Sequence, residues 1–253
     1  MIARPTLRDR QLESPLGLVS PLVKLGVAVG WLIGLAFTTA HAPPLFITVV
    51  ALASGLVLGR IPAASLARAI LPLWTVAAVV VAGNILFGAA NTDPTATVIA
   101  RIGPLRVTVE AASTATALGL RVVAIASVGA VFALTTEPTR LVDSLAQQAR
   151  LSPRFAYGAL AAYQAIPRFG EDLAALRDAR RLRGLRWSWH PQLLVSLLVL
   201  AVRHGDRVAL AMDARAFGSG RHTNYRVVSW GVLDLATVLV SVAILAIALA
   251  VGE

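Results

Sequence analysis

The residues able to do chemistry gather in one stretch of the sequence, residues 169–217. Two arginines, Arg183 and Arg215, each lie at the predicted end of a helix, next to small residues. A guanidinium is planar, stays charged and can clamp a carboxylate through two hydrogen bonds, so the two arginines could dock onto an acidic groove of another protein. The same stretch holds carboxylates that could bind a metal ion for chemistry on lipid phosphates, namely Asp172, Asp178, Asp206 and Asp213.

The sequence lacks the residues needed for several other kinds of chemistry. The chain has no Cys, which excludes disulfides and thiolate metal sites. Its only lysine is Lys24, and no glycine-rich phosphate-binding loop ending in lysine is present, so the chain does not resemble a P-loop ATPase. No Gly-x-Ser-x-Gly motif occurs. The histidines show no metal-ligand spacing, and we expect them in loops or helix interfaces: His41, His190, His204 and His222. The sequence thus predicts no cofactor.

The composition is that of a membrane protein. Of the 253 residues, 57% are hydrophobic and only 14% are charged. The mean hydropathy is +0.74. Soluble domains carry about 25% charged residues, so a soluble fold could not bury this much apolar surface. The net charge of +10 fits basic loops at a membrane surface and does not imply nucleic acid.

Five apolar segments predict about five transmembrane helices in an all-α, polytopic membrane protein. A helix needs about 20 apolar residues to cross a bilayer. The segments are residues 22–40, 44–58, 70–90, 111–134 and 229–251, of which the second is short and reads as a tilted span. Two further apolar segments, 154–166 and 193–202, are too short to span and are predicted to be interfacial or protein-buried helices.

The basic residues predict the orientation. All but Arg101, Arg106 and Arg121 of the 23 Lys and Arg residues fall on the side that holds the N-terminus, which is therefore expected to be cytoplasmic, in the cell membrane. The predicted organisation is an N-terminal cytoplasmic segment, a four-span region, a cytoplasmic coupling-helix region and a final span. Their boundaries are residues 1–21, 22–134, 135–228 and 229–253.

The cytoplasmic region is expected to be helical. It is rich in Ala and Leu, and four prolines divide it into about four pieces: Pro138, Pro153, Pro167 and Pro191. Two pieces are amphipathic and end near a glycine that could stop a helix, Gly184 and Gly218. Four arginines on either side of Gly184, apart from Arg183, predict a solvated or lipid-facing basic face, with a surface ion pair between Asp178 and Arg181. That face comprises Arg177, Arg180, Arg181 and Arg186.

The ends of these two helices resemble a known family. Residues 179–184 read ARRLRG and residues 211–217 read AMDARAF. The pattern resembles the paired Ala-Arg-Gly motifs of the transmembrane T component of energy-coupling factor (ECF) transporters, the group of the cobalt-transport Q protein. Residues 20–25, SPLVKL, are similar to the family's Asp-Pro-x-x-Lys-Leu at the start of the first span. In this sequence Leu182 and Ala216 replace the Ala and Gly of the family motifs.

The resemblance implies a function. The chain would be a non-catalytic subunit that couples two cytosolic ABC-type ATPases to a substrate-binding membrane S component, which imports a vitamin or a metal ion. Membrane lipid is the other expected partner. The ATPase-coupling residues implied are Ala179, Arg183, Gly184, Ala214, Arg215 and Ala216. The motif arginines could also serve only to complement a helix dipole or anionic lipid.

Two charges fall inside predicted spans and are functional candidates by default. Arg121 is the candidate for an internal polar contact, whereas Asp234 is expected to reach the membrane interface.

A metal-dependent membrane enzyme acting on lipid phosphates stays as the alternative function. Its nearest pattern is that of alcohol phosphatidyltransferases around Asp213, without the glycine and the other aspartates that pattern needs. A self-sufficient carrier is the third class, although no internal repeat is visible.

Overall fold

The computed structural model describes residues 14–38, 40–92, 95–102, 105–185, 190–217 and 226–251. Predictions made for Arg186, Gly218, His222 and residues 1–13 lie outside these ranges. The chain divides into two compact units. Unit 1 is Met1–Glu137 with Ser229–Glu253, and unit 2 is Pro138–Val228.

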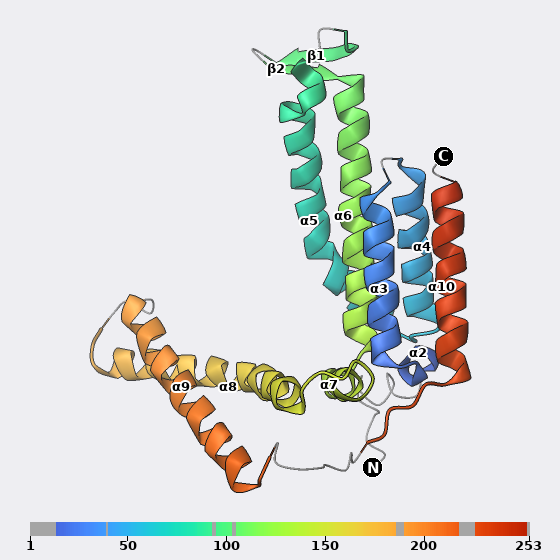
Figure 1. The fold of residues 1–253 in the computed structure, drawn as a ribbon. Helices are drawn as coiled ribbons and strands as arrows, with labels where there is room; N and C mark the ends of the chain where they lie inside the picture. Colours follow the sequence, from blue (N-terminus) through green and yellow to red (C-terminus); the bar gives the residue numbers. More distant parts are fainter. Residues whose placement is uncertain are drawn as a thin grey trace, which may run out of the picture. The chain divides into compact units, whose positions relative to one another are not determined.

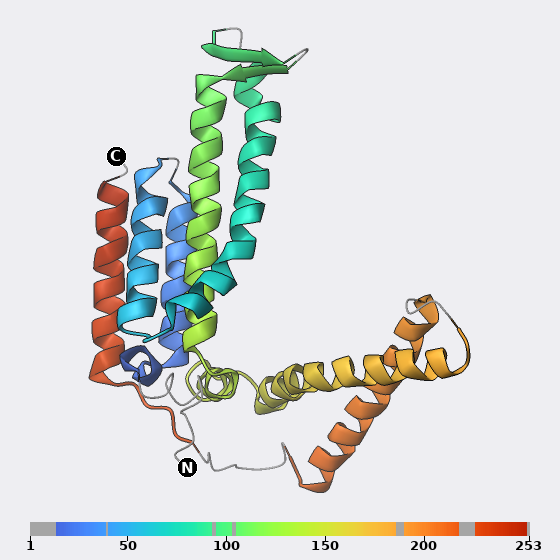
Figure 2. The same ribbon diagram turned by 180° about the vertical axis from the view of Figure 1, so that it is seen from behind.

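Unit 1 is a bundle of apolar helices. It contains α3 (Pro21–Ala36), α4 (Ala42–Val57), α6 (Val109–Thr135) and α10 (Val232–Ala250), which lie side by side in Figures 1 and 2. Their shared core holds large side chains against small ones, including Trp31, Leu35, Ile47, Ala124 and Ala248. Alanine lets helices approach closely, so packing of this kind can hold helices together without a hydrophobic driving force.

Within unit 1 the longest pair of helices is α5 (Ala63–Phe87) with α6, and it extends beyond the shorter helices (Figure 1). At about 1.5 Å per residue, the 27 residues of α6 measure ~40 Å and the 16 residues of α3 ~24 Å. The far ends are joined by the 3₁₀ turn η1 (Ala89–Thr92) and two antiparallel strands, β1 (Val98–Ile102) and β2 (Leu105–Thr108). The strands were not predicted, although Val, Ile and Thr favour them.

One asparagine closes this hairpin. The Asn91 side chain accepts hydrogen bonds from the Thr108 N–H and hydroxyl, both 3.1 Å, and donates to the Ile85 carbonyl at 2.8 Å. Thr108 is also the N-cap of α6, where its hydroxyl accepts from the Ala111 N–H. Asn91 therefore ties the end of α5 to the beginning of α6.

The prediction of an all-α membrane protein is confirmed. In the part of the chain that the structure describes, three helices, α5, α6 and α10, are long and apolar enough to cross a membrane, and α3 and α4 are shorter apolar helices. The ends differ from prediction in two places. α3 ends at Ala36 rather than at residue 40, because the N–H of Phe37 turns back to Gly34 and Leu35. α5 begins at Ala63 rather than at residue 70, so Arg68 lies in the helix and not in a loop, with Nε donating to the Ala64 carbonyl.

Unit 2 consists of α7 (Pro138–Gln147), α8 (Pro153–Leu182) and α9 (Pro191–Ala214). Pro138, Pro153 and Pro191 begin these helices, as expected for a residue whose missing N–H needs no partner in the first turn. The prediction that Pro167 also divides the chain was wrong, since α8 continues through it. A single proline removes one hydrogen bond, and the Ala- and Leu-rich residues on both sides re-form the helix.

Candidate functional site

The two arginine motifs adopt the same local geometry, although they end different helices. Arg183 is the C-cap of α8 and Arg215 is the C-cap of α9. After α8, the N–H of Gly184 donates to the Arg181 carbonyl at 2.9 Å and that of Leu185 to the Arg180 carbonyl at 3.2 Å. This pair of bonds is a Schellman motif, which satisfies carbonyls that the end of a helix leaves open.

The end of α9 repeats the motif. The N–H of Ala216 donates to the Asp213 carbonyl at 2.9 Å, and that of Phe217 to the Met212 carbonyl at 3.0 Å. The residue after the C-cap has positive φ in both motifs, 74° at Gly184 and 53° at Ala216. The family's glycine at this position thus has a backbone reason, because a left-handed conformation costs a residue with a Cβ about 1–2 kcal/mol. Ala216 adopts the same conformation despite its methyl group.

The predicted site residues lie at the surface of unit 2. Arg183 and Arg215 are both exposed, as are Ala179, Gly184, Ala214 and Ala216. The structure does not gather them into one pocket. α9 crosses α8, and the C-terminal ends of the two helices lie apart in both views of unit 2 (Figures 1 and 2). The arrangement presents two separate cationic tips, each at a helix end that carries partial negative charge.

The second tip is attached to the rest of unit 2 by an aromatic contact that the sequence analysis missed. Phe217 meets Tyr157 of α8 edge to face, with ring centroids 6.0 Å apart and an interplanar angle of 85°. The Tyr157 hydroxyl donates to Asp143 of α7 at 2.7 Å. The hydrogen bond to the Asp143 carboxylate, with burial, raises the pKa of Tyr157 to about 12. Phe217, Tyr157 and Asp143 thus link the tip to both α8 and α7.

Gln147 makes a second attachment within unit 2. Its Nε2 donates to the Arg226 carbonyl at 2.7 Å, and its Oε1 accepts from the Val228 N–H at 3.0 Å. The end of α7 therefore holds the backbone at Arg226 and Val228. The predicted ion pair is also present, with 3.6 Å between Arg181 and Asp178. Both side chains are about two-thirds exposed, so this pair adds little stability.

Two charged side chains in the bundle of unit 1, Arg121 and Asp234, form hydrogen bonds with backbone groups at helix ends. Arg121 of α6 donates from Nη2 to the Thr38 carbonyl, just beyond the end of α3. Asp234 does not reach an exposed position, as had been expected, but is 4% exposed. Its Oδ1 accepts from the Ser20 N–H at 2.7 Å and its Oδ2 from the Gly231 N–H at 2.9 Å, so it joins the first turns of α3 and α10. Arg121 and Asp234 each bond to backbone groups rather than to one another.

The metal-dependent alternative finds no supporting geometry. Among the described residues, no three His, Asp or Glu side chains come together in a way that could hold a metal ion. The three described histidines have other contacts. His41 Nε2 bonds to the Ser113 carbonyl and the Thr116 hydroxyl, His190 caps the beginning of α9, and the His204 ring packs edge to face on Phe169.

Comparisons with known proteins agree with this architecture. The family model of the CbiQ cobalt transport protein matches residues 14–225. An energy-coupling factor transporter transmembrane protein, EcfT, of Heliobacterium modesticaldum is 27% identical over 233 residues, covering 83% of this chain and 82% of that protein. A putative ABC transporter ATP-binding protein of Bifidobacterium longum is 29% identical over 160 residues, covering 56% of this chain. The match spans only 20% of the Bifidobacterium protein.

Proposed function

Because the chain belongs to the CbiQ cobalt transport protein family, that of the transmembrane T components of ECF transporters, we propose that it couples two cytosolic ABC-type ATPases to a separate substrate-binding membrane subunit. The observation that supports this most is the twin Schellman geometry, which presents one exposed arginine at the end of α8 and one at the end of α9. Two equivalent tips suit two ATPase subunits, one for each.

The proposed mechanism begins at the tips. An acidic groove in one ATPase would bind Arg183, and the same groove in the other would bind Arg215. Because two capping hydrogen bonds hold each helix end, a displacement of the end can move the whole helix along its axis. When the ATPases close on ATP, α8 and α9 would move with them. The contacts of Phe217 with Tyr157, and of Tyr157 with Asp143, carry the motion of the second tip into α8 and α7.

The apolar face of the crossed helices is the proposed surface for the substrate-binding subunit. Within unit 2, Leu193 of α9 is buried, and five apolar residues after it are 45–64% exposed, which favours the interfacial over the protein-buried interpretation of this segment. These residues are Leu194, Val195, Leu198, Val199 and Val202. Exposed apolar patches of this kind mark interaction sites. Movement of α9 would reorient the bound subunit and release a vitamin or metal ion inward.

The chain itself is proposed to be non-catalytic. ATP binding of the P-loop kind needs a lysine on the phosphates, and the single lysine, Lys24, is bonded to the Thr135 carbonyl inside the bundle. The proposed orientation places the N-terminus and unit 2 in the cytoplasm, on the side of most of the basic residues.

Co-purification tests the proposal. The tagged chain is expressed with its host's ATPases and solubilised gently, and the ATPases should accompany it. Arg183→Glu with Arg215→Glu should abolish their association. Arg168→Glu with Arg207→Glu is the matched control, because these exposed arginines lie on the same two helices, well before their C-terminal ends. Retention of the ATPases by the tip variant would refute the docking role.

The substrate-binding subunit is tested separately. Val195→Asp with Leu198→Asp places charges on the exposed apolar face of α9 and leaves both tips intact. We expect this variant to keep the ATPases and lose the membrane partner. If the variant lost both the ATPases and the membrane partner, or kept both, the tips and the apolar face would not bind different partners.

A further inference from the structure

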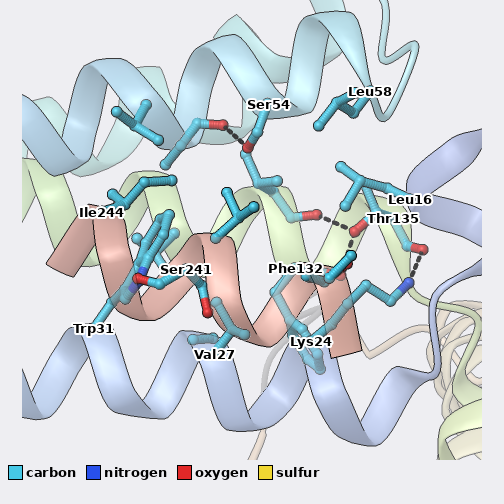
Figure 3. Close-up of a pocket in the computed structure, with 18 of the residues that line it drawn as sticks. Leu16, Lys24, Val27, Trp31, Ser54, Leu58, Phe132, Thr135, Ser241 and Ile244 are labelled. Atoms are coloured by element: carbon cyan, nitrogen blue, oxygen red, sulfur yellow. Dashed lines mark hydrogen bonds between the residues drawn. The ribbon is translucent and has the colours of Figure 1, made fainter. Parts of the chain in front are cut away.

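An apolar cavity lies inside unit 1, between α3, α4, α6 and α10 (Figure 3). Its volume is about 300 Å³. It lies near the end of the bundle where α3 and α10 begin and α4 and α6 end, with Leu16 of the short helix α2 (Pro15–Leu18) among its lining residues. Aliphatic and aromatic side chains form most of its wall, including Trp31, Val128 and Ile244.

The hydroxyl groups in the wall are hydrogen-bonded within their own helices. Ser54 donates to the Ala51 carbonyl, Thr135 to Val131, Thr237 to Leu233 and Ser241 to Val238, all at 2.7–2.8 Å. Hydroxyls that donate to a carbonyl one turn earlier present little polarity to the cavity. Such a space is poorly suited to water, which needs two to four polar partners.

The cavity is closed on one side and open on another. Its lining residues on α3 and α6 include buried side chains such as Ala28, Trp31 and Val128. Its lining residues on α10 and at the C-cap of α4 include exposed ones, with Leu58 46%, Leu233 54% and Val240 58% exposed. The mouth therefore opens sideways, between the end of α4 and the beginning of α10.

We propose that this cavity is a lipid site that binds an acyl chain of an anionic membrane phospholipid. The mouth lies on helices that form the membrane-spanning bundle, so hydrocarbon chains are the molecules outside it. An empty apolar space would forfeit dispersion contacts with its walls, and a hydrocarbon chain restores them. Among the described residues of the wall, Lys24 is the only charged one. Its ammonium donates to the neutral Thr135 carbonyl, so this end of the cavity carries a positive charge that favours an anionic headgroup. The site lies wholly in unit 1, so it does not depend on the coupling role of unit 2.

Trp31 provides the probe, because it lines the cavity and is only 8% exposed. The protein is prepared with Trp31 as its only tryptophan, the other four replaced by Phe, in vesicles of phosphatidylglycerol with brominated acyl chains. Bromine quenches indole fluorescence on contact. The reference is a protein whose only tryptophan is Trp74, which lies on α5 and is 58% exposed to the surroundings.

The proposal expects brominated chains to quench Trp31 as strongly as Trp74. Ala236→Phe narrows the mouth on an exposed position of α10 and should restore the emission of Trp31 alone. Ala246→Phe, an exposed position on the same helix outside the cavity wall, should leave the quenching unchanged. Brominated phosphatidylcholine should quench Trp31 less than phosphatidylglycerol does.

Two outcomes would overturn the site, and a third would overturn its preference for an anionic headgroup. Unquenched Trp31 beside quenched Trp74 would show that no chain enters. Equal recovery of Trp31 emission with Ala236→Phe and Ala246→Phe would show that the chain approaches from elsewhere. Equal quenching by the two headgroups would remove the anionic part of the proposal.

Discussion

Lys24, in the second turn of α3, donates from Nζ to the carbonyl of Thr135, the last residue of α6, at 2.7 Å. At the opposite end of the same helix pair the donor and acceptor helices are exchanged. There Arg121 of α6 donates to the Thr38 carbonyl beyond α3. Each of the two antiparallel helices therefore supplies a cation to the C-terminal carbonyls of the other. A cation at a helix C-terminus complements the dipole and satisfies an open acceptor.

The first prediction concerns this bond. Lys24→Met keeps most of the side-chain volume but leaves the Thr135 carbonyl without its donor in a buried place, so we expect a loss of about 1–3 kcal/mol in the free energy of unfolding. Lys24→Arg is the control that keeps a charged donor. Thermal unfolding in detergent measures both, and an unchanged Tm for Lys24→Met would show that the bond contributes nothing to stability.

The second prediction concerns the two helix ends. Ala216→Gly removes the methyl group from a residue with φ 53° and should stabilise the end of α9 by about 1 kcal/mol. Gly184→Ala makes the reverse change at φ 74° and should destabilise the end of α8 by a similar amount. Amide hydrogen exchange rates of residues 180–185 and 212–217 measure the local stability of the two helix ends separately. Changes of the same sign in the two variants would contradict the shared geometry.

The third prediction concerns Tyr157. Its pKa is raised from 10.0 to about 12 because its hydroxyl donates to the Asp143 carboxylate. A pKa raised in the folded state contributes stability that is fully present below pH 10 and is lost as the pH rises through about 12. An ultraviolet titration should show one late tyrosine, absent in Tyr157→Phe and moved to lower pH in Asp143→Asn. An unmoved late step in Asp143→Asn would exclude the carboxylate as the cause.

The sequence predicted what depends on local pattern. Apolar segments located the five bundle helices, and Gly184 marked the end of α8. It did not show contacts between residues far apart in the chain. The bond of Asp234 to Ser20 places a carboxylate inside the protein instead of at the interface, and the contact of Phe217 with Tyr157 joins residues of different helices. Periodicity reports which face of a helix is apolar, but not which partner that face meets. The prediction that Pro167 interrupts the helix was wrong for a related reason. A proline ends a helix only where the residues around it do not favour helix.

The fourth prediction concerns a tight contact between α5 and α6, at Val81 and Gly119. A Cβ at Gly119 of α6 would overlap Cγ2 of Val81 in α5, so Gly119→Ala should push the helices apart and lower stability. Val81→Ala removes the methyl groups that cause the overlap, and it should be mildly destabilising alone because it loses packing. Combined with Gly119→Ala it should recover most of the loss, giving a coupling energy that a double-mutant cycle in detergent unfolding measures. Gly129→Ala is the control, since a Cβ there meets nothing within 4 Å. Additive effects of the two substitutions would show that the helices do not meet at this pair.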